Sequence, residues 1–561
     1  MAYRLFQYIQ LIVVLFYALS PLSRAQEESI SNRLTTEHLI DRLRSIKNPS
    51  AQHELSDEIH PNVKCGFGIQ AQVVSRWKEF SQVQRAELSV LMKTDAMQCD
   101  TIAGHFHIFY DTSGINEPAL LDNNNQRIQG TAKAYIDLVA QIFNDVWNIE
   151  INQMGYSAPP PENGQSYYNI YVQDMQDYGV TNFNETTRIN SGQDPPRYQS
   201  SITVDNDFQE NQYYTHGINA LKVTAAHEFH HAIQIGSYGF WAEDLFAHEL
   251  TSTWLEDVVY TDVNDYYQYL TDFFGDQQLA NGFWNGLSFN SNNFGGYERS
   301  VFAHCLSKLF GADIMKDIWT GMKTFPFLES TDAALVKRGS NLQFTFAKFT
   351  KWNYYTADRA DTVNFYTEGN HYPRFRPLQK TAFFNTSSTI TGKAESLSSS
   401  MYEFDLPKDT ITAVVANVDI GNAIQRNTTQ QNIEVTLTSG LQLNISVDTL
   451  SLWSTFLIQS STQTDVPRLQ LTAAPNPLRL AEAPWLKLSI NQDKSKTAEV
   501  FFFTSSFKLA YSGFLKVDNE DGFRAIVVPT SEIKSKLSSG IYFIIAKTAK
   551  SDYKWKVAVI R

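Results

Sequence analysis

The sequence predicts an α+β domain followed by two all-β modules, and changes in residue pattern along the chain support this. Residues 101–375 begin with short alternating runs typical of strands and continue with helical patterns. Residues 376–472 are rich in Ser, Thr, Val and Ile in short alternating runs, which predict a β-sandwich. Residues 473–561 follow a Pro-punctuated junction and predict a second β-sandwich module. A chain of 561 residues is too long for one core, so several domains are expected.

The first 100 residues are predicted to contain an export signal and a separate helical segment. Arg4 precedes an apolar run of about fifteen residues, and small residues around Ala25 are typical of a cleavage site. Residues 1–25 are therefore interpreted as a signal peptide, because the run is too short to span a bilayer comfortably and no later run is longer. Residues 26–100 are polar with helical patterns and are interpreted as a propeptide or N-terminal helical segment. The mature protein is expected to be exported, with no membrane span.

The composition narrows the class of partner. The chain is 43% hydrophobic and 19% charged, which is typical of globular proteins, and its formal net charge is −13. Phosphate binding needs clustered Lys and Arg, and the first 400 residues contain no basic block, which argues against nucleic acid as the main partner.

The strands and helices of residues 101–375 can be placed in order. Alternating runs predict strands near residues 104–111, 167–175 and 200–208. Apolar residues at helical spacing predict a helix over 131–149 and another over 218–236, the second ending at Gly236. Helical patterns then dominate to about residue 355.

The second of these helices carries the stretch HEFHH. His227 and His231 lie one turn apart on the same face, the separation that two ligands need on one tetrahedral Zn²⁺ ion. Glu228 is displaced around the helix, where it can take a proton from water that the zinc polarises. His230 is left over and is expected to pack or to support a ligand.

A catalytic zinc needs a third protein ligand. The longer motif H-E-x-x-H-x-x-G-x-x-H would supply a third histidine, but Gln234 occupies its glycine position and Ser237 its last histidine position. The segment WAEDLFAHELTSTWLED (residues 241–257) offers Glu249 and Glu256 on one helix face, and spacing alone leaves both open.

Residues Trp241, Asp244, Leu245 and Glu249 resemble the W-x-x-D-L-x-x-x-E segment of the gluzincin clan, which includes the thermolysin and aminopeptidase families. The resemblance implies a zincin-like fold with Glu249 as the third ligand and Glu256 as a hydrogen-bond partner of a ligating histidine. The segment GGYERSVFAHCLSKLFG resembles the aminopeptidase helix whose leading tyrosine stabilises the oxyanion, which implies that role for Tyr297. No G-x-M-E-N segment is present to bind a free amino terminus, so the resemblance favours an endopeptidase.

Two further resemblances concern about residues 60–370 and the C-terminal module. Motifs between about residues 60 and 370, among them GHFHIFYDTSG, YNIYVQDM, ALKVTAAHEFHHAIQ and WLEDVVY, are similar to those of a group of secreted bacterial metalloproteases. The C-terminal sequence LSSGIYFIIAKTAKSDYKWKVAVIR resembles the sorting domain of the Por-type (type IX) secretion system. It implies a secreted or cell-surface protein of a Gram-negative bacterium, with the secretion machinery as a partner.

The favoured function is therefore a secreted zinc endopeptidase that acts on proteins or peptides. One alternative is a surface adhesin or binding protein on a catalytically idle metalloprotease scaffold. Another is a zinc hydrolase that acts on a non-peptide bond. An idle scaffold is expected to have lost the base or a ligand, and Glu228, His227 and His231 are all present.

The three cysteines and two polar pairs allow more than one interpretation. Cys65 and Cys99 can form a disulfide, and Cys305 is expected to be a buried free thiol. The sequence KCGFG at residues 64–68 is also compatible with a thiolate that blocks a zinc site in a zymogen, although a disulfide or a plain free thiol is favoured. His105 with His107 and Asp205 with Asp207 are weak metal candidates, interpreted instead as a strand surface and a solvated loop.

Overall fold

The computed structural model describes most of the chain from residue 34 onward. The described residues are 34–47, 64–94, 96–191, 195–275, 282–288, 296–377 and, between 379 and 561, all but 383–387, 407–408, 421–430, 439–441, 448–452, 460–464, 471–472, 475, 491–494, 505–507, 521–522 and 550–551. The predicted signal peptide, residues 1–25, lies outside the described residues.

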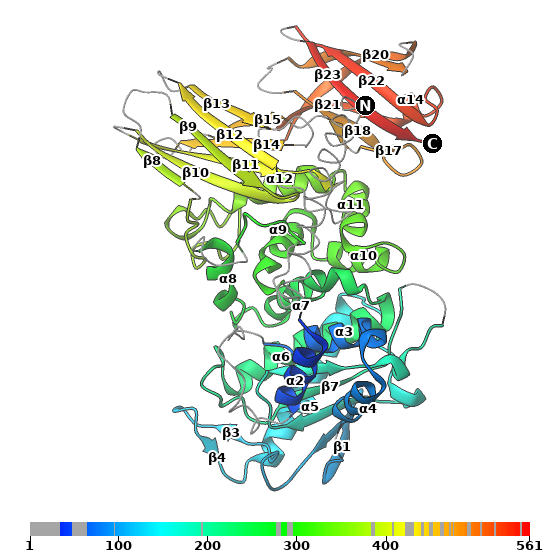
Figure 1. Ribbon diagram of the computed structural model, residues 1–561, viewed down its shortest axis with the longest axis vertical. Coiled ribbons are helices and arrows are strands. Elements are labelled where there is room, and N and C mark those ends of the chain that lie inside the picture. The colour runs from blue at the N-terminus through cyan, green and yellow to red at the C-terminus, as the bar shows by residue number, and fades with distance from the viewer. Residues whose placement is uncertain are drawn as a thin grey trace, which may run out of the picture.

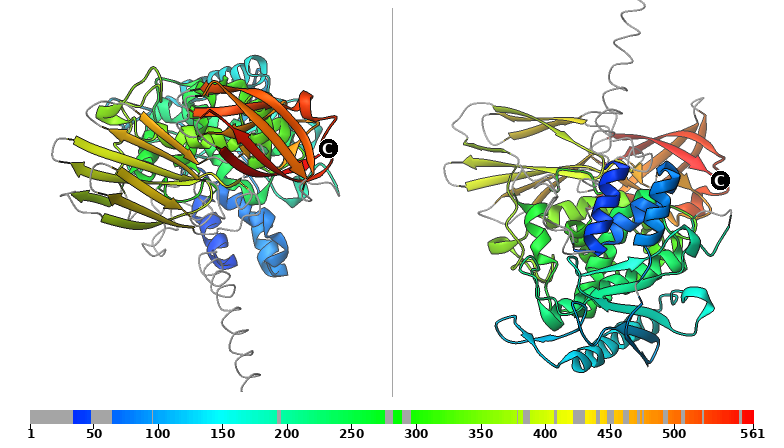
Figure 2. Two further views of the ribbon diagram at one scale, coloured as in Figure 1. Left: turned by 90° about the horizontal axis from the view of Figure 1, so that it is seen from above. Right: turned by 60° about the horizontal axis from the view of Figure 1, so that its bottom comes forward.

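The N-terminal segment is helical, and its helices lie against the domain that follows (Figures 1 and 2). The pattern around residues 75–92 is divided in two, because a capping box of Ser81 and Gln84 starts a new helix. The elements are α2 (Thr36–Lys47), α3 (Phe67–Ser75), η2 (Trp77–Glu79) and α4 (Gln82–Leu91).

A five-stranded sheet follows, in the order β1-β2-β5-β7-β6. The three inner strands β2, β5 and β7 are parallel, and the edge strands β1 and β6 are antiparallel to their neighbours. The bounds are β1 (Cys99–Ala103), β2 (Phe106–Tyr110), β5 (Tyr168–Gln173), β6 (Gly179–Asn182) and β7 (Ser201–Asp205), with a separate β3–β4 pair (Leu120–Leu121 and Arg127–Ile128). Helices α5 (Ala132–Trp147) and α6 (Gly217–Ile233) pack together against the sheet.

The edge strand β6 has a partner from the N-terminal segment. Cys65 forms a parallel bridge with Gly179, Gly66 N–H donates to the Gly179 carbonyl at 3.0 Å, and Tyr178 N–H donates to the Lys64 carbonyl at 2.9 Å. This backbone pairing covers the Gly179 end of the edge that β6 presents.

Helix α6 runs through the core and is not amphipathic, since its residues from Ala220 to Ile233 are buried on every face except at Lys222. The predicted end at Gly236 is wrong. A π-helical turn, η6 (Gln234–Tyr238), extends the helix, and the extended helix ends at Gly239 with φ of 125°. Gly236 serves a close approach instead, because a Cβ there would lie 2.6 Å from Pro160 Cδ.

Helices dominate the rest of this domain, and one buried core joins them to the sheet and to the N-terminal segment. Further π and 3₁₀ turns are η3 (Asn148–Gln153), η4 (Glu162–Gly164), η5 (Glu185–Thr187), η7 (Ala242–Asp244), η9 (Tyr297–Arg299) and η10 (Ala357–Arg359). The remaining helices are α7 (Leu245–Val259), α8 (Tyr267–Phe274), α9 (Ser300–Phe310), α10 (Asp313–Gly321), α11 (Phe327–Lys337) and α12 (Leu342–Trp352).

The C-terminal third is built mainly of strands, in two groups that Figure 1 shows in yellow and in orange to red. The first group makes a five-stranded sheet, β15-β14-β11-β10-β8, and a three-stranded sheet, β13-β12-β9. Its strands are β8 (Gln379–Ala382), β9 (Ser388–Ala394), β10 (Ser398–Leu406), β11 (Asp409–Asn417), β12 (Gln431–Thr438), β13 (Gln442–Val447), β14 (Trp453–Gln459) and β15 (Asp465–Gln470).

The second group makes an eight-stranded sheet, β16-β18-β21-β20-β19-β22-β23-β17, with a core of its own. Its elements are β16 (Ala473–Ala474), β17 (Leu478–Arg479), β18 (Trp485–Ser489), β19 (Thr497–Thr504), β20 (Leu509–Glu520), β21 (Phe523–Pro529), α14 (Thr530–Ile533), β22 (Gly540–Lys547) and β23 (Asp552–Ile560). The chain is thus a mixed α/β protein with two strand-rich regions after the helical one. Among the described helices, none has the length and apolar character that a membrane crossing needs.

Candidate metal centre

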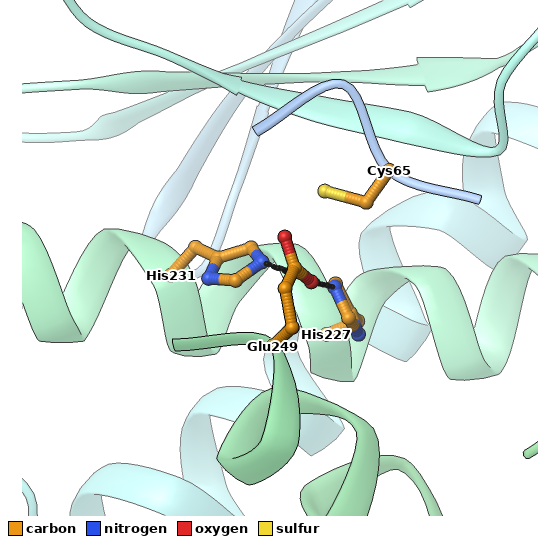
Figure 3. Close-up of side chains that lie close together, drawn as sticks. All are labelled: Cys65, His227, His231 and Glu249. Carbon is orange, nitrogen blue, oxygen red and sulfur yellow. Dashed lines mark hydrogen bonds and ion pairs between the residues drawn. The ribbon is translucent and has the colours of Figure 1, made fainter. Parts of the chain in front are cut away.

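Four side chains from three parts of the chain meet inside the α/β domain (Figure 3). Helix α6 supplies His227 and His231, α7 supplies Glu249, and Cys65 comes from the segment paired with β6. All four are buried, and one ligand atom of each lies within 4.8 Å of those of the others. Within the described residues this is a His/Cys/Glu cluster at metal-binding distance.

The three donors from α6 and α7 form a compact triangle. His227 Nε2 lies 3.0 Å from His231 Nε2 and 3.1 Å from Glu249 Oε2, and His231 Nε2 lies 3.4 Å from the same oxygen. A tetrahedral ion with ligands at about 2.0 Å has donors about 3.3 Å apart, which the three distances approach. The donors are thus spaced as they would be around a small cation.

Hydrogen bonds behind the two imidazoles direct their Nε2 atoms into the triangle. His227 Nδ1 donates to Glu256 Oε1 at 2.7 Å, and His231 Nδ1 lies 2.9 Å from Gln234 Oε1. Because the proton of each ring is on Nδ1, in a hydrogen bond to its acceptor, the Nε2 atom keeps a lone pair for a cation. Glu256 therefore lies outside the triangle and Glu249 lies within it.

Sequence reasoning missed the part played by Gln234. Its carbonyl oxygen also accepts from His248 Nδ1 at 2.8 Å, and its amide donates to the His248 carbonyl, Thr251 and Ser252, each at 3.1 Å. Gln234 thereby ties the end of α6 to α7. Its position three residues after His231 on the same helix was the available signal.

Buried charge is balanced within the cluster. Desolvation lowers the pKa of His227, but hydrogen bonds to Glu249 and Glu256 outweigh it and raise this pKa to about 9. Burial raises the pKa of Glu249, but the charge of His231 and the hydrogen bonds to both histidines lower it to about 2. The electrostatics of the site thus favour an anionic carboxylate beside a positive charge.

Glu228 lies on the sheet side of α6 and is held by β6. Thr181 Oγ1 donates to Glu228 Oε2 at 2.7 Å and to the Glu228 carbonyl at 2.9 Å. The strand can come this close because residue 179 is glycine, whose added Cβ would lie 2.8 Å from Thr224 Cγ2 and 3.1 Å from Glu228 Cγ. Glu228 also neighbours the Cys65 thiol, so it faces the cluster.

Tyr297, at the start of η9, stacks on His227 and Tyr269. Its ring lies 5.9 Å from that of His227 and 4.8 Å from that of Tyr269. Burial, followed by the charge of Glu249, raises the Tyr297 pKa well above its ordinary value. The phenol therefore stays protonated at neutral pH and can donate a hydrogen bond.

Trp241 and Asp244, which precede α7, have structural partners. Trp241 Nε1 donates to the Met322 carbonyl at 2.7 Å, and the Asp244 carboxylate accepts from Phe327 N–H at 2.8 Å, at the N-terminus of α11. These contacts fix the start of α7, from which Glu249 projects.

The Cys65–Cys99 disulfide, which the sequence left open, is not formed, and all three cysteines are free. Cys65 is buried in the cluster, while Cys99 is half-buried on β1 and Cys305 is buried in α9, as expected. Burial, and then the charges of Glu228 and Glu249, raise the pKa of the Cys65 thiol well above its ordinary value, an effect that a bound metal cation would reverse.

The remaining histidine candidates lie elsewhere. His230 Nδ1 lies 3.2 Å from Glu150 Oε2, away from the triangle. His105 stacks on Trp147 with ring centroids 4.0 Å apart, and His107 Nε2 lies 2.7 Å from Asp100 Oδ2. His107 lies on β2, whereas His105 lies in the turn before this strand, so the interpretation of both as one strand surface is wrong for His105. Each of the two has a partner other than a metal.

The interpretation of Asp205 and Asp207 as a solvated loop is wrong, because both are buried. Asp205 accepts hydrogen bonds from the backbone N–H groups of Met175, Asp207 and Phe208. It also groups with Asp174 and Glu210, whereas Asp207 pairs with Arg127. Asp205 thus orders the turn after β7.

Comparisons with known proteins do not indicate a function for the centre. No family model matches the chain, and no curated protein matches it. Among solved structures, the crystal structure of neural ectodermal development factor IMP-L2 is similar over 33% of this chain and 90% of that chain, at 11% identity and a TM-score of 0.12. A likeness this weak carries no argument about fold or function.

The position of Glu256 leads to a first prediction. Glu256→Gln keeps an oxygen that accepts from His227 Nδ1 but removes the negative charge that makes this imidazole a better ligand. We expect the metal to bind in the same stoichiometry with an affinity about 10–100-fold lower. Competition with a chromophoric chelator measures this change, and an unchanged affinity would exclude Glu256 from supporting the site.

Proposed function

We propose that this protein is a zinc-dependent endopeptidase with a zincin-like catalytic domain, in which His227, His231 and Glu249 hold the metal. The observation that carries the proposal is the triangle of two imidazole nitrogens and one carboxylate oxygen, 3.0 to 3.4 Å apart, with Glu228 beside it. Two imidazoles and one carboxylate are a donor set that zinc peptidases use. When bound, zinc supplies Lewis acidity that activates water and polarises the carbonyl under attack.

The residues around the triangle support hydrolysis. Glu228 is proposed as the base that takes a proton from the attacking water and passes it to the leaving amine. The hydrogen bond from Thr181 orients its carboxylate. Tyr297, kept protonated by burial, is proposed to donate to the oxyanion of the substrate carbonyl.

The edge of the sheet favours a peptide over a non-peptide substrate. Strand β6 carries Thr181, which bonds Glu228, and the start of its edge pairs with another backbone segment through the bridge at Cys65. A peptide that pairs with the same edge would pass beside the triangle. A catalytically idle adhesin scaffold remains the alternative, and the presence of Glu228 and of all three ligands argues against it.

Export and sorting are proposed from the sequence alone. We propose that residues 1–25 direct the protein across the inner membrane of a Gram-negative cell and that the C-terminal module, residues 473–561, engages a type IX machinery. The segment IYFIIAK in that module corresponds to β22, which pairs with the lysine-bearing β23.

The proposed function is tested by metal analysis together with digestion of a casein-type substrate. Because the Cys65 sulfur lies in the cluster, Cys65→Ser is assayed beside the wild type. We expect about one zinc per chain, hydrolysis by the zinc-loaded Cys65→Ser protein, loss of hydrolysis on removal of zinc by a chelator, and recovery when zinc is restored. Hydrolysis that is unaffected when the metal is removed would overturn the proposal.

A further inference from the structure

We propose that Cys65 is a fourth ligand of the metal and that residues Lys64 to Phe67 form a plug that keeps the centre closed. The inference rests on the proposed function and adds its regulation: the full chain folds as a latent peptidase. Three features of the plug support this inference: the pairing of its backbone with β6, the ion pairs of Lys64 and the stacking of the Phe67 ring.

The plug backbone occupies the edge that a substrate would use. Cys65 bridges Gly179 of β6 in the parallel sense, with hydrogen bonds of 3.0 Å from Gly66 N–H and 2.9 Å to the Lys64 carbonyl. The bridge places the residue with the thiol opposite the glycine that packs on Glu228. An extended peptide cannot pair with Gly179, the residue of β6 beside Glu228, while this segment is there.

The Lys64 side chain anchors one end of the plug. Its Nζ lies 2.6 Å from Glu256 Oε2 and 2.7 Å from Asp265 Oδ2, and all three side chains are buried. A buried ammonium is stable only when paired, so two carboxylates on separate elements hold this residue in place. Glu256 also bonds His227 Nδ1, which connects the anchor directly to the ligand set.

Phe67 anchors the other end. Its ring stacks on His231 with centroids 3.9 Å apart and an interplanar angle of 8°. Its backbone N–H donates to Cys65 Sγ at 3.2 Å, a contact that orients the sulfur. Figure 3 shows this sulfur on the side of the cluster away from α7, with its Cα set back in the plug segment.

Four protein ligands make a closed centre, whereas a catalytic zinc keeps one position open for water. With Cys65 bound, its thiol proton is released to solvent and sulfur takes the position that water needs. Helices α2, α3 and α4 all precede β1, so the plug belongs to a segment that joins the sheet by one connection. Lys93, Ala96 and Gln98 are exposed in this connection, and a cut here would separate the plug from β1.

Cobalt substitution tests the ligand directly, because a thiolate bound to Co²⁺ gives a sulfur-to-metal charge-transfer band. We expect this band in the full-length wild type and in Cys99→Ser, the matched control on β1. We expect Cys65→Ser to bind one Co²⁺ without the band. A wild-type protein that binds Co²⁺ without the band would overturn the inference and leave the proposed function standing.

Hydrolysis of casein tests the latency. We expect zinc-loaded Cys65→Ser to hydrolyse casein at least about tenfold faster than the wild type. The reason is that, in the latent wild type, Cys65 leaves the fourth metal position free for less than about a tenth of the time. Equal hydrolysis by the two proteins would overturn the latency and leave the peptidase intact. Lys64 and Phe67 still anchor the plug in Cys65→Ser, so this protein is also assayed after the connection between Lys93 and Gln98 is cut and the N-terminal fragment is removed. If it then cleaves no faster than Cys65→Ser/Glu228→Gln treated in the same way, the proposed peptidase and its latency both fail, whereas the cobalt band still decides the ligand.

Discussion

Replacing Glu228 by Gln is expected to abolish peptide hydrolysis while the metal stays bound. In the Cys65→Ser background, where the fourth position is free, we expect the rate to fall by at least about 10²-fold. The amide has the size of the carboxylate and its oxygen can still accept from Thr181 Oγ1, so the packing against β6 is kept. What is lost is the ability to take a proton from water.

This result is measured by digestion of a casein-type substrate at matched metal content and matched melting temperature. Glu243→Gln, an exposed substitution of the same kind in η7, is the control and should retain full activity. Near-normal hydrolysis by the Glu228→Gln protein would show that this carboxylate is not the base.

The second large effect is expected at Glu249. In the Cys65→Ser background, removing its carboxylate by Glu249→Ala deletes one vertex of the triangle and leaves two imidazoles facing one another at 3.0 Å. We expect the protein to lose stoichiometric zinc, a larger effect than the about 10–100-fold change that loss of an outer hydrogen-bond partner causes. Elemental analysis after dialysis against a zinc buffer measures this loss.

Glu256→Ala is the comparison that separates the two carboxylates on α7. Because Glu256 Oε1 accepts from His227 Nδ1 and lies outside the triangle, this variant is expected to keep a weakened site. If Glu256→Ala emptied the site while Glu249→Ala stayed loaded, the two roles would have to be exchanged.

The core of the candidate centre could be predicted from sequence because its information is local. His227 and His231 are separated by one helical turn, so the helix alone brings them to one face. The prediction of Glu249 needed the register of Trp241, Asp244 and Leu245. Trp241 donates to the Met322 carbonyl and Asp244 accepts from Phe327 N–H, which gives a physical reason for a tryptophan and an aspartate at these two positions.

The sequence suggested that Cys65 could block a zinc site, but it could not determine where this thiol lies in the fold. A cysteine pattern indicates which thiols exist, but which far segment each one meets depends on tertiary packing. Here the pairing of Lys64 and Gly66 with β6, and the ion pairs of Lys64 with Glu256 and Asp265, determine where the thiol lies. None of these contacts is local in the chain.

The end of helix α6 could not be predicted from the local sequence either. Gly236 is a reasonable stop signal, yet α6 continues as a π-helical turn because Tyr198 N–H bonds the Ile235 carbonyl and Gln234 bonds α7. Tertiary hydrogen bonds outweighed the propensity of one glycine. The predicted strands near residues 104–111, 167–175 and 200–208 correspond to β2, β5 and β7, because alternation over a short run is a local property.

The burial of all four donor side chains has a kinetic consequence. His227, His231, Glu249 and Cys65 each expose 3% or less of their surface, so an ion bound among them would exchange slowly with solvent. Association and release must then wait for a local opening of the protein, and the opening rate sets the exchange time regardless of how strong a chelator is. An ion acquired as the chain folds would remain with that molecule for much of its lifetime, so the metal found in the isolated protein records where it folded.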